Sequence, residues 1–389
     1  MKVTMDPDLD YPELREGVAR ICADFPGAYW RGLEDRQDYP TAFVSALTEA
    51  GYLAALIPEE YGGAGLPLRA AAVILETINA AGCNASQGHA QMYIMGTLLR
   101  HGSEEQKQRF LPEIAAGRLR LQAFGVTEPT TGSDTTQLKT RAARDGEDYV
   151  VTGQKVWTSR ALHSDLMLLL ARTTPAEQCA RRSDGLSVFI VDIRESLGRG
   201  LEIRPLQAMI NHNTTEVFFD QLRVPAANRI GAEGKGFRYI LDGMNAERIL
   251  VASECIGDGR FFLEKAVAYA NERVVFGRTI GKNQGIQFPL ARAFAEIEAA
   301  DLMARKGAAL FDPGDPCGTE ANIAKLLASE AAWKAADATM QTFGGFSFAR
   351  DYDVERKWRD CRIYQIAPLS TNLILSYVAE HVLGLERSY

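Results

Sequence analysis

The stretch Phe124-Gly125-Val126-Thr127-Glu128-Pro129-Thr130-Thr131-Gly132-Ser133-Asp134 lies at the first change of texture along the chain. Before it, residues 1–120 are rich in Ala, Leu and Glu, in stretches such as 68–81 and 97–116, which is typical of helices. After it, short β-branched and aromatic runs separated by turns continue to about residue 229. We therefore expect a helical region followed by a sheet, with the quoted stretch at the junction.

A second change of texture follows the glycine-rich segment 231–236. Residues 237–271 form a run too long and continuous for anything but a long helix. Because no helices separate the expected strands, the middle region favours an antiparallel sheet or barrel over βαβ units. A chain of 389 residues allows two to three domains. The predicted fold is α+β and mostly α, with an N-terminal helical domain at 1–120, a middle antiparallel β domain at 121–230 and a C-terminal helical domain at 231–389.

Composition and charge exclude several classes of protein. A net charge of −7 argues against a nucleic-acid binder, whose affinity comes mainly from basic groups on phosphates. No stretch reaches about 18 consecutive apolar residues, so we expect no transmembrane helix. Residues 1–6 lack a signal-peptide pattern, and the six cysteines are scattered without a CxxC pair. The five histidines are far apart. We therefore expect a cytoplasmic protein without disulfides and without a metal site.

Five segments resemble the motifs of one family, in that family's order. The opening stretch resembles the TEPxxGSD signature of the acyl-CoA dehydrogenase family. The other four segments are Gly153-Gln154-Lys155-Val156-Trp157-Thr158-Ser159, Arg273-Val274-Val275-Phe276-Gly277 followed by Gln284, Gln341-Thr342-Phe343-Gly344-Gly345, and Arg359-Asp360 with Ile363-Tyr364. Each motif is weak alone, but their ordered coincidence is a strong signal.

The resemblance implies an FAD-dependent flavoprotein that oxidises acyl-CoA thioesters to 2,3-enoyl-CoA, in fatty-acid or amino-acid catabolism. It implies a C-terminal domain built as a four-helix bundle. It also implies a homo-oligomer, with a tetramer favoured and a dimer as the alternative, with FAD at the subunit interface and an electron-transfer flavoprotein as electron acceptor.

Matching positions assign the cofactor contacts that the resemblance implies. The backbone at Val126 and the Thr127 hydroxyl would hold the pyrimidine edge of the flavin. Trp157 would cover the flavin face, and Ser159 would donate to N5. Arg273 would pair with the pyrophosphate of a neighbouring subunit's FAD, where a bidentate cation suits phosphate oxygens. The full set of implied cofactor residues is Phe124, Val126, Thr127, Ser133, Trp157, Thr158, Ser159, Arg273, Phe276, Gln284, Gln341, Gly344, Gly345, Ser370 and Asn372.

Some of these residues also have an ordinary structural interpretation. A lone tryptophan in a strand, such as Trp157, is usually part of a core. The pair Gly344-Gly345 in isolation is usually a turn. Arg273 at a helix end is ordinarily a dipole partner or a solvated charge. To replace the functional interpretation, all of these structural explanations would have to hold together, by chance, at positions that match the order and spacing of the family motifs.

The expected catalytic base is Glu247. Many family members carry the base in an IYxxYEGT-like string, but Pro368 stands at that position here and no carboxylate follows closely. In the branch typified by isovaleryl-CoA and long-chain acyl-CoA dehydrogenases, the base lies earlier, in L-x-x-E-R-L-x-x-A. The sequence Met244-Asn245-Ala246-Glu247-Arg248-Ile249-Leu250-Val251-Ala252 resembles that pattern. Ile240, Met244, Glu247 and Val251 share one helical stripe, so burial of Glu247 is expected. The alternative is a structural glutamate paired with Arg248.

The implied substrate-binding residues are Ser133, Asn245, Arg248, Pro368 and Leu369. In relatives, the backbone N–H at the position of Pro368 helps to bind the thioester carbonyl, and proline has none. Either the Leu369 amide substitutes, or a ribityl hydroxyl of the flavin contributes more, or the chemistry differs. A same-fold monooxygenase, desulfinase or oxidase is therefore the alternative function, and an inactive scaffold is a third.

Overall fold

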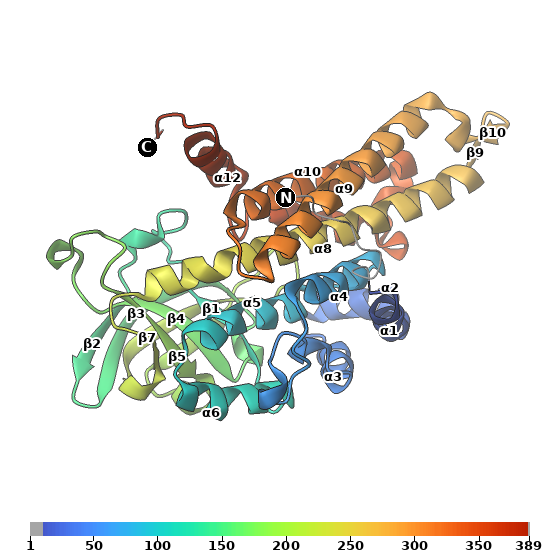
Figure 1. Ribbon diagram of the computed structural model, residues 1–389. Coiled ribbons are helices and arrows are strands. Elements are labelled where there is room, and N and C mark those ends of the chain that lie inside the picture. The colour runs from blue at the N-terminus through green and yellow to red at the C-terminus, as the bar shows by residue number, and fades with distance from the viewer. Residues whose placement is uncertain (1–10, 388–389) are drawn as a thin grey trace. The chain divides into compact units, whose positions relative to one another are not determined.

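A computed structural model describes residues 11–387 (Figure 1). These residues are mostly helical with one large sheet, which confirms the predicted fold class. Internal contacts divide them into two compact units. We call these the helical unit, with residues 11–36, 67–85 and 245–387, and the sheet unit, with residues 37–66 and 86–244.

The helical unit contains the long helix predicted for residues 237–271, which the structure confirms as α8. Its helices are α1 (Pro12–Ala23), α2 (Gly27–Arg36), α4 (Leu68–Ala80), most of α8 (Gly236–Glu272), α9 (Gln284–Phe311), α10 (Gly318–Phe343), α11 (Val354–Arg362) and α12 (Thr371–Tyr377). A small antiparallel ribbon, β9 (Val274–Val275) with β10 (Arg278–Thr279), joins α8 to α9.

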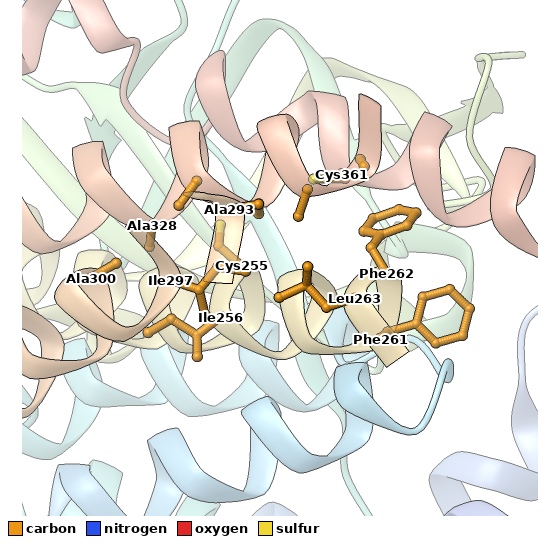
Figure 2. Packing of buried hydrophobic residues seen from close by; sticks show 14 of the residues in the cluster. Cys255, Ile256, Phe261, Phe262, Leu263, Ala293, Ile297, Ala300, Ala328 and Cys361 are labelled. Atoms are coloured by element: carbon orange, nitrogen blue, oxygen red, sulfur yellow. The ribbon is translucent and has the colours of Figure 1, made fainter. Parts of the chain in front are cut away.

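Small side chains allow α8, α9 and α10 to pack closely. Figure 2 shows Ile256 and Phe262 of α8, Ile297 of α9 and Ala328 of α10 in one buried cluster. α10 buries alanines along much of its length, so its neighbours can approach its backbone. Burial of a large side chain such as Phe262 stabilises the fold by roughly 2–3 kcal/mol. This cluster holds the framework that carries α11 and the segment after it.

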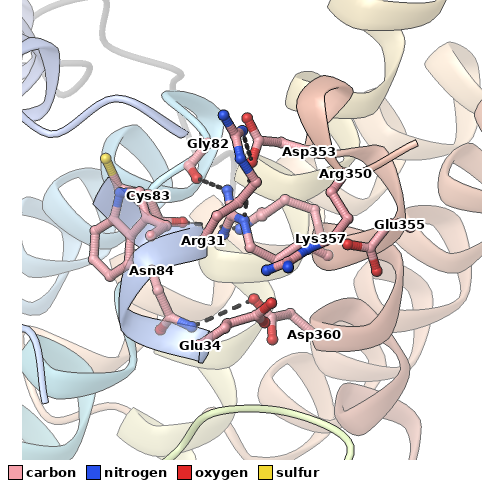
Figure 3. Close-up of polar contacts among 12 residues, drawn as sticks. Arg31, Glu34, Gly82, Cys83, Asn84, Arg350, Asp353, Glu355, Lys357 and Asp360 are labelled. Carbon is pink, nitrogen blue, oxygen red and sulfur yellow. Dashed lines mark hydrogen bonds and ion pairs between the residues drawn. The ribbon is translucent and has the colours of Figure 1, made fainter. Parts of the chain in front are cut away.

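α11 is fixed by buried and half-buried polar contacts (Figure 3). The Lys357 ammonium lies 2.5 Å from an Asp258 carboxylate oxygen. It also donates to the Cys83 carbonyl at 2.9 Å, and both of these residues are labelled in Figure 3. Arg359 pairs with Glu34 of α2 at 2.9 Å. Because these partners come from three distant parts of the chain, they set the position at which the chain leaves α11.

The sheet unit combines helices with eight strands. Its helices are α3 (Thr41–Glu49), α5 (Ser86–His101), α6 (Glu104–Ala115) and α7 (Ile193–Ser196). Its strands are β1 (Leu121–Gly125), β2 (Arg141–Asp145), β3 (Asp148–Ser159), β4 (Leu166–Arg172), β5 (Leu186–Asp192), β6 (Leu201–Pro205), β7 (Thr214–Pro225) and β8 (Arg229–Ile230). α6 begins with a capping box, in which the Ser103 hydroxyl accepts from the Gln106 N–H and the Gln106 side chain accepts from the Ser103 N–H.

The sheet is mostly antiparallel, as predicted, but it also contains two parallel pairings that the strand pattern did not predict. The strand order is β6-β7-β3-β2-β4-β5-β8, and β1 pairs with β4. β1 lies parallel to β4, and β2 touches β4 in parallel at Arg141 and Arg172. Parallel neighbours need a crossover of a dozen or more residues, and the β2–β3 hairpin supplies one between β1 and β4.

The central strands β4 and β5 separate two apolar cores. Every residue of β4 is buried, so both of its faces are covered. Leu168 and Leu170 face a cluster that includes residues of α5 and α6. Met167 and Leu169 face a cluster that includes residues of β3, β6 and β7. This alternation follows from the two-residue period of a strand, and it fixes the register of β1 beside β4.

Candidate active site

The motif at residues 124–134 forms the end of β1 and the loop after it. Its backbone is tied to β3, which carries the second motif. The Thr127 carbonyl accepts from the Val156 N–H at 2.9 Å, and the Val126 carbonyl accepts from the Lys155 ammonium at 2.9 Å. The two motifs therefore share one local structure. Val126 and Thr127 are half-buried, and Phe124 is half-buried against Tyr93.

A buried ion pair joins the same two motifs. The Lys155 ammonium lies 2.9 Å from a Glu128 carboxylate oxygen, and the two side chains are 0% and 5% exposed. The Glu128 carboxylate also accepts from the backbone N–H groups of Lys139 and Thr140 at 2.6 and 2.9 Å. Burial lowers the pKa of Lys155 to about 8 even though Glu128 opposes it. Burial raises the pKa of Glu128, but Lys155 and the backbone donors outweigh it and hold that pKa below its ordinary value.

Trp157 is not a core residue. Its side chain is 60% exposed, and its backbone has a φ of 60°, which is uncommon for a residue other than glycine. It lies in an irregularity of the β3–β7 pairing between Lys155 and Thr158, so the indole leaves the regular strand surface. A strained, exposed aromatic side chain is more consistent with ligand contact than with packing.

The surroundings of Trp157 fit one face and edge of a flavin. Ser159 is half-buried, and its hydroxyl oxygen lies 3.5 Å from that of Thr214. The Thr158 hydroxyl is buried and makes no hydrogen bond within residues 11–387, whereas Ser133 is exposed. A flat apolar surface with hydroxyls and backbone groups beside it is what an isoalloxazine ring requires.

The helical unit holds a separate hollow at the end of α8. Its volume is about 740 Å³, and its lining includes Arg273, Phe346, Gly344 and Gly345. The Arg273 guanidinium lies 5.7 Å from the centre of the Phe346 ring and forms no ion pair with any residue from 11 to 387. A side chain at either glycine would point into open space, so the backbone there is accessible. An unpaired guanidinium above accessible backbone fits a phosphate-bearing ligand.

The remaining residues that the resemblance assigns to the cofactor lie outside this lining. Phe276, Gln284 and Gln341 are exposed. Ser370 is the N-cap residue before α12, and its hydroxyl accepts from the Leu373 N–H at 3.4 Å. Asn372 is exposed on the first turn of the helix. Ser370 thus has a local role as a helix cap.

Glu247 lies on α8 and is only 4% exposed, as the helical stripe predicts. Val251, one turn further along, is fully buried. The Arg248 guanidinium donates to the Asn245 side-chain oxygen at 2.8 Å. Burial lowers the pKa of Arg248, and the nearby Glu247 charge opposes that shift. α8 therefore places a buried carboxylate, a cation and an amide within one turn.

Pro368 and Leu369 follow α11 and the short 3₁₀ helix η11 (Ile363–Gln365). The Tyr364 hydroxyl anchors η11 by donating to Glu254 of α8 at 2.9 Å. Pro368 is exposed and Leu369 is half-buried. No hydrogen bond formed by residues 11–387 uses the Leu369 N–H, which is therefore available as a donor.

Sequence reasoning missed two buried lysines, Lys155 and Lys325. Lys155 stands within a quoted motif, and its partner is Glu128. Lys325 is 0% exposed on α10 and donates to the Leu369 carbonyl at 2.7 Å. The available signal was a lysine on the same helical face as Ala321 and Ala328, in a stripe otherwise made of small residues.

Three family models match consecutive parts of the chain. They describe the N-terminal domain (residues 10–118), the middle domain (123–222) and the C-terminal domain (234–383) of acyl-CoA dehydrogenases. Among residues 11–387, the structure contains no helix that is long and apolar enough to cross a membrane.

Individual relatives match along nearly the whole chain. Acyl-CoA dehydrogenase FadE12 of Mycobacterium tuberculosis is 34% identical over 379 residues, which cover 97% of this chain and 96% of the relative. A solved glutaryl-coenzyme A dehydrogenase, in complex with glutaryl-CoA, is 30% identical with a TM-score of 0.90 and covers 100% of this chain and 98% of its own. A chain from the solved electron transferring flavoprotein of Acidaminococcus fermentans is 28% identical with a TM-score of 0.90 and covers 98% of this chain and 100% of its own.

Proposed function

The chain belongs to the acyl-CoA dehydrogenase family, a family of FAD-dependent oxidoreductases, and on this premise we propose that it converts a saturated acyl-CoA thioester to the 2,3-enoyl-CoA. The observation that carries the proposal is the burial of Glu247 beside Arg248 and Asn245 on α8, while no carboxylate occupies position 368. A buried carboxylate has lost hydration, which strengthens it as a base once it is ionised.

In this proposal, a carboxylate oxygen of Glu247 takes the proton from the α-carbon of the thioester. Arg248 and Asn245 bind the CoA portion or orient the substrate. Ser133, by the resemblance alone, is a further proposed substrate contact. The Leu369 amide donates to the thioester oxygen in place of the N–H that Pro368 lacks. A preorganised donor at a developing oxyanion is worth about 10²–10³ in rate, so the Leu369 amide must replace the missing N–H for the reaction to be fast.

The residues of both units fit FAD. In the sheet unit, Trp157 would cover the flavin face, and Thr127 and Ser159 would bind its edge. In the helical unit, Arg273 and the Gly344-Gly345 backbone would bind the phosphate-bearing half of a cofactor held by a second subunit. When bound, FAD supplies the acceptor for the β-hydride. FAD and CoA are both anions, so local cations such as Arg273 must bind them despite the net charge of −7.

We further propose a homo-oligomer, with a tetramer favoured, and an electron-transfer flavoprotein as electron acceptor. The chain from the A. fermentans electron transferring flavoprotein structure supports the choice of acceptor. The three-domain division at 1–120, 121–230 and 231–389 is also a proposal, and the three family models support it.

The test of the function is anaerobic mixing of the yellow holoenzyme with a panel of saturated acyl-CoAs. Bleaching of the flavin band, with one equivalent of enoyl-CoA found by mass spectrometry, is the expected result. Pro368 favours the alternative of a same-fold enzyme with altered chemistry. If no thioester bleaches the flavin, and the enzyme reduced with an added chemical reductant instead consumes oxygen and yields a hydroxylated product, the alternative replaces the dehydrogenase.

A further inference from the structure

Lys325 is a buried cation in a place where an apolar side chain would be expected. It lies on α10 between Ala321 and Ala328, and its side chain is fully buried. Burial of an ammonium group is unfavourable unless the charge is hydrogen-bonded or paired. A leucine or methionine would fill the same space without that penalty. The lysine therefore calls for an explanation other than packing.

The ammonium group of Lys325 has one defined backbone target. It donates to the Leu369 carbonyl at 2.7 Å, across 44 positions of sequence. Leu369 lies between η11 and α12, in a segment whose Pro368 has no N–H to contribute. A residue whose carbonyl is held has less freedom about its own backbone bonds, so the contact also restricts the direction of the Leu369 N–H.

The charges around Lys325 come from α8. Burial lowers the pKa of Lys325 to about 8. Cys255 raises that pKa, Arg248 lowers it and Glu247 raises it. The group is therefore mainly protonated at neutral pH, and it lies within electrostatic range of the proposed base.

We propose that Lys325 is a positioning residue, which holds the Leu369 carbonyl and so restricts the backbone of Leu369 to a conformation in which its N–H can donate to the thioester oxygen. This inference rests on the proposed dehydrogenation. It assigns the lysine a part in that reaction although the side chain does not touch the substrate. A purely structural lysine would affect folding but would not affect the polarisation of the bound thioester.

The test compares Lys325→Met with Lys334→Met in the holoenzyme. Lys334 lies on the same helix but is 55% exposed and paired with Glu296, so its variant controls for the loss of a lysine from α10. At saturating acyl-CoA, we expect flavin bleaching to be about 10- to 100-fold slower in Lys325→Met, with little change in the concentration for half-maximal rate, because the donor is displaced rather than removed. Lys334→Met should bleach at the wild-type rate.

A second measurement reports the thioester directly. In a Glu247→Gln background the substrate stays unreacted, so the carbonyl stretch of acyl-CoA labelled with ¹³C at the thioester carbon can be recorded when bound. Adding Lys325→Met should move that band back toward its position in free acyl-CoA. Lys325→Gln, whose side chain is polar but too short to reach the Leu369 carbonyl, should shift the band in the same direction. It replaces Lys325→Met if the methionine variant does not fold.

The outcomes separate the two proposals. A wild-type flavin that no acyl-CoA bleaches overturns the proposed function and this role together. A wild type that is bleached, with folded Lys325 variants that match it in both rate and carbonyl band, overturns only the role of Lys325. A slower rate with an unchanged carbonyl band also overturns it, because the lysine would then act by some route other than the Leu369 amide.

Discussion

Replacing Lys155 by methionine tests the buried ion pair that joins the first two motifs. The substitution removes the contact with the Glu128 carboxylate and the contact with the Val126 carbonyl, both at 2.9 Å. Glu128, which is 5% exposed, keeps the backbone donors of Lys139 and Thr140 but has no cationic partner left among residues 11–387. The variant therefore carries an uncompensated buried carboxylate beside the proposed flavin edge.

The expected destabilisation follows from these contacts. Removing one partner of a buried pair costs about 3–5 kcal/mol, and the backbone donors that Glu128 retains place this case near the lower value, about 3 kcal/mol. For a unit of this size, that corresponds to a fall in Tm of roughly 6–12 °C. Since Lys155 holds the pKa of Glu128 down, the stability that Glu128 contributes is present above its ordinary pKa and is lost as pH falls. The deficit of Lys155→Met should therefore be larger above about pH 5 than below about pH 4.

The assay is denaturant unfolding of the holoenzyme, followed by circular dichroism and by flavin release. Lys139→Met is the matched control, because the Lys139 side chain is exposed and only its backbone contacts Glu128. Adding Glu128→Gln to Lys155→Met should recover part of the loss by removing the buried charge. If the free energy of unfolding of Lys155→Met lies within about 0.5 kcal/mol of that of Lys139→Met, the reasoning about the ion pair is refuted.

Three further predictions follow from other sites. Burial raises the pKa of Asp258 to about 7, so the stability of wild type relative to Asp258→Asn should be greatest below about pH 4 and should decline as pH rises through 7. The measurement is the urea midpoint of both proteins across a pH series, and a difference that does not change with pH would contradict this prediction. Arg273→Ala should weaken FAD retention on gel filtration at least ten-fold while Arg278→Ala does not, and equal retention would remove Arg273 from the phosphate site. Ser103→Ala should destabilise the sheet unit by about 1 kcal/mol in urea unfolding, and no loss would argue against the capping box.

Much of the helical structure could be predicted from sequence because it depends on local signals. Composition and periodicity located α8 within one residue at each end, and Ser103 marked the start of α6. The same helical arithmetic predicted the burial of Glu247. These features depend on residues within a few turns of each other, which a single sequence displays directly.

The arrangement of the sheet depends on contacts between distant segments. The parallel pairing of β1 with β4 depends on which strands meet, and periodicity carries no information about that. The exposure of Trp157 results from an irregular pairing with β7, whereas strand propensity alone favours a core residue. The contact between Lys325 and the Leu369 carbonyl joins residues 44 positions apart, so the sequence alone does not reveal it. Non-local packing thus decided the geometry of the site, while the motifs indicated its chemistry.

The central claim is that Glu247 is the base of an acyl-CoA dehydrogenase. Its most direct test is the rate of flavin bleaching in a single anaerobic turnover, measured for wild type, Glu247→Gln and Glu247→Asp with an acyl-CoA that reduces the wild type. The account predicts that Glu247→Gln binds the thioester but bleaches at least about 10³-fold more slowly, and that Glu247→Asp retains part of the rate because it keeps a displaced carboxylate. Bleaching of Glu247→Gln at the wild-type rate would contradict the account, since another group would then remove the α-proton.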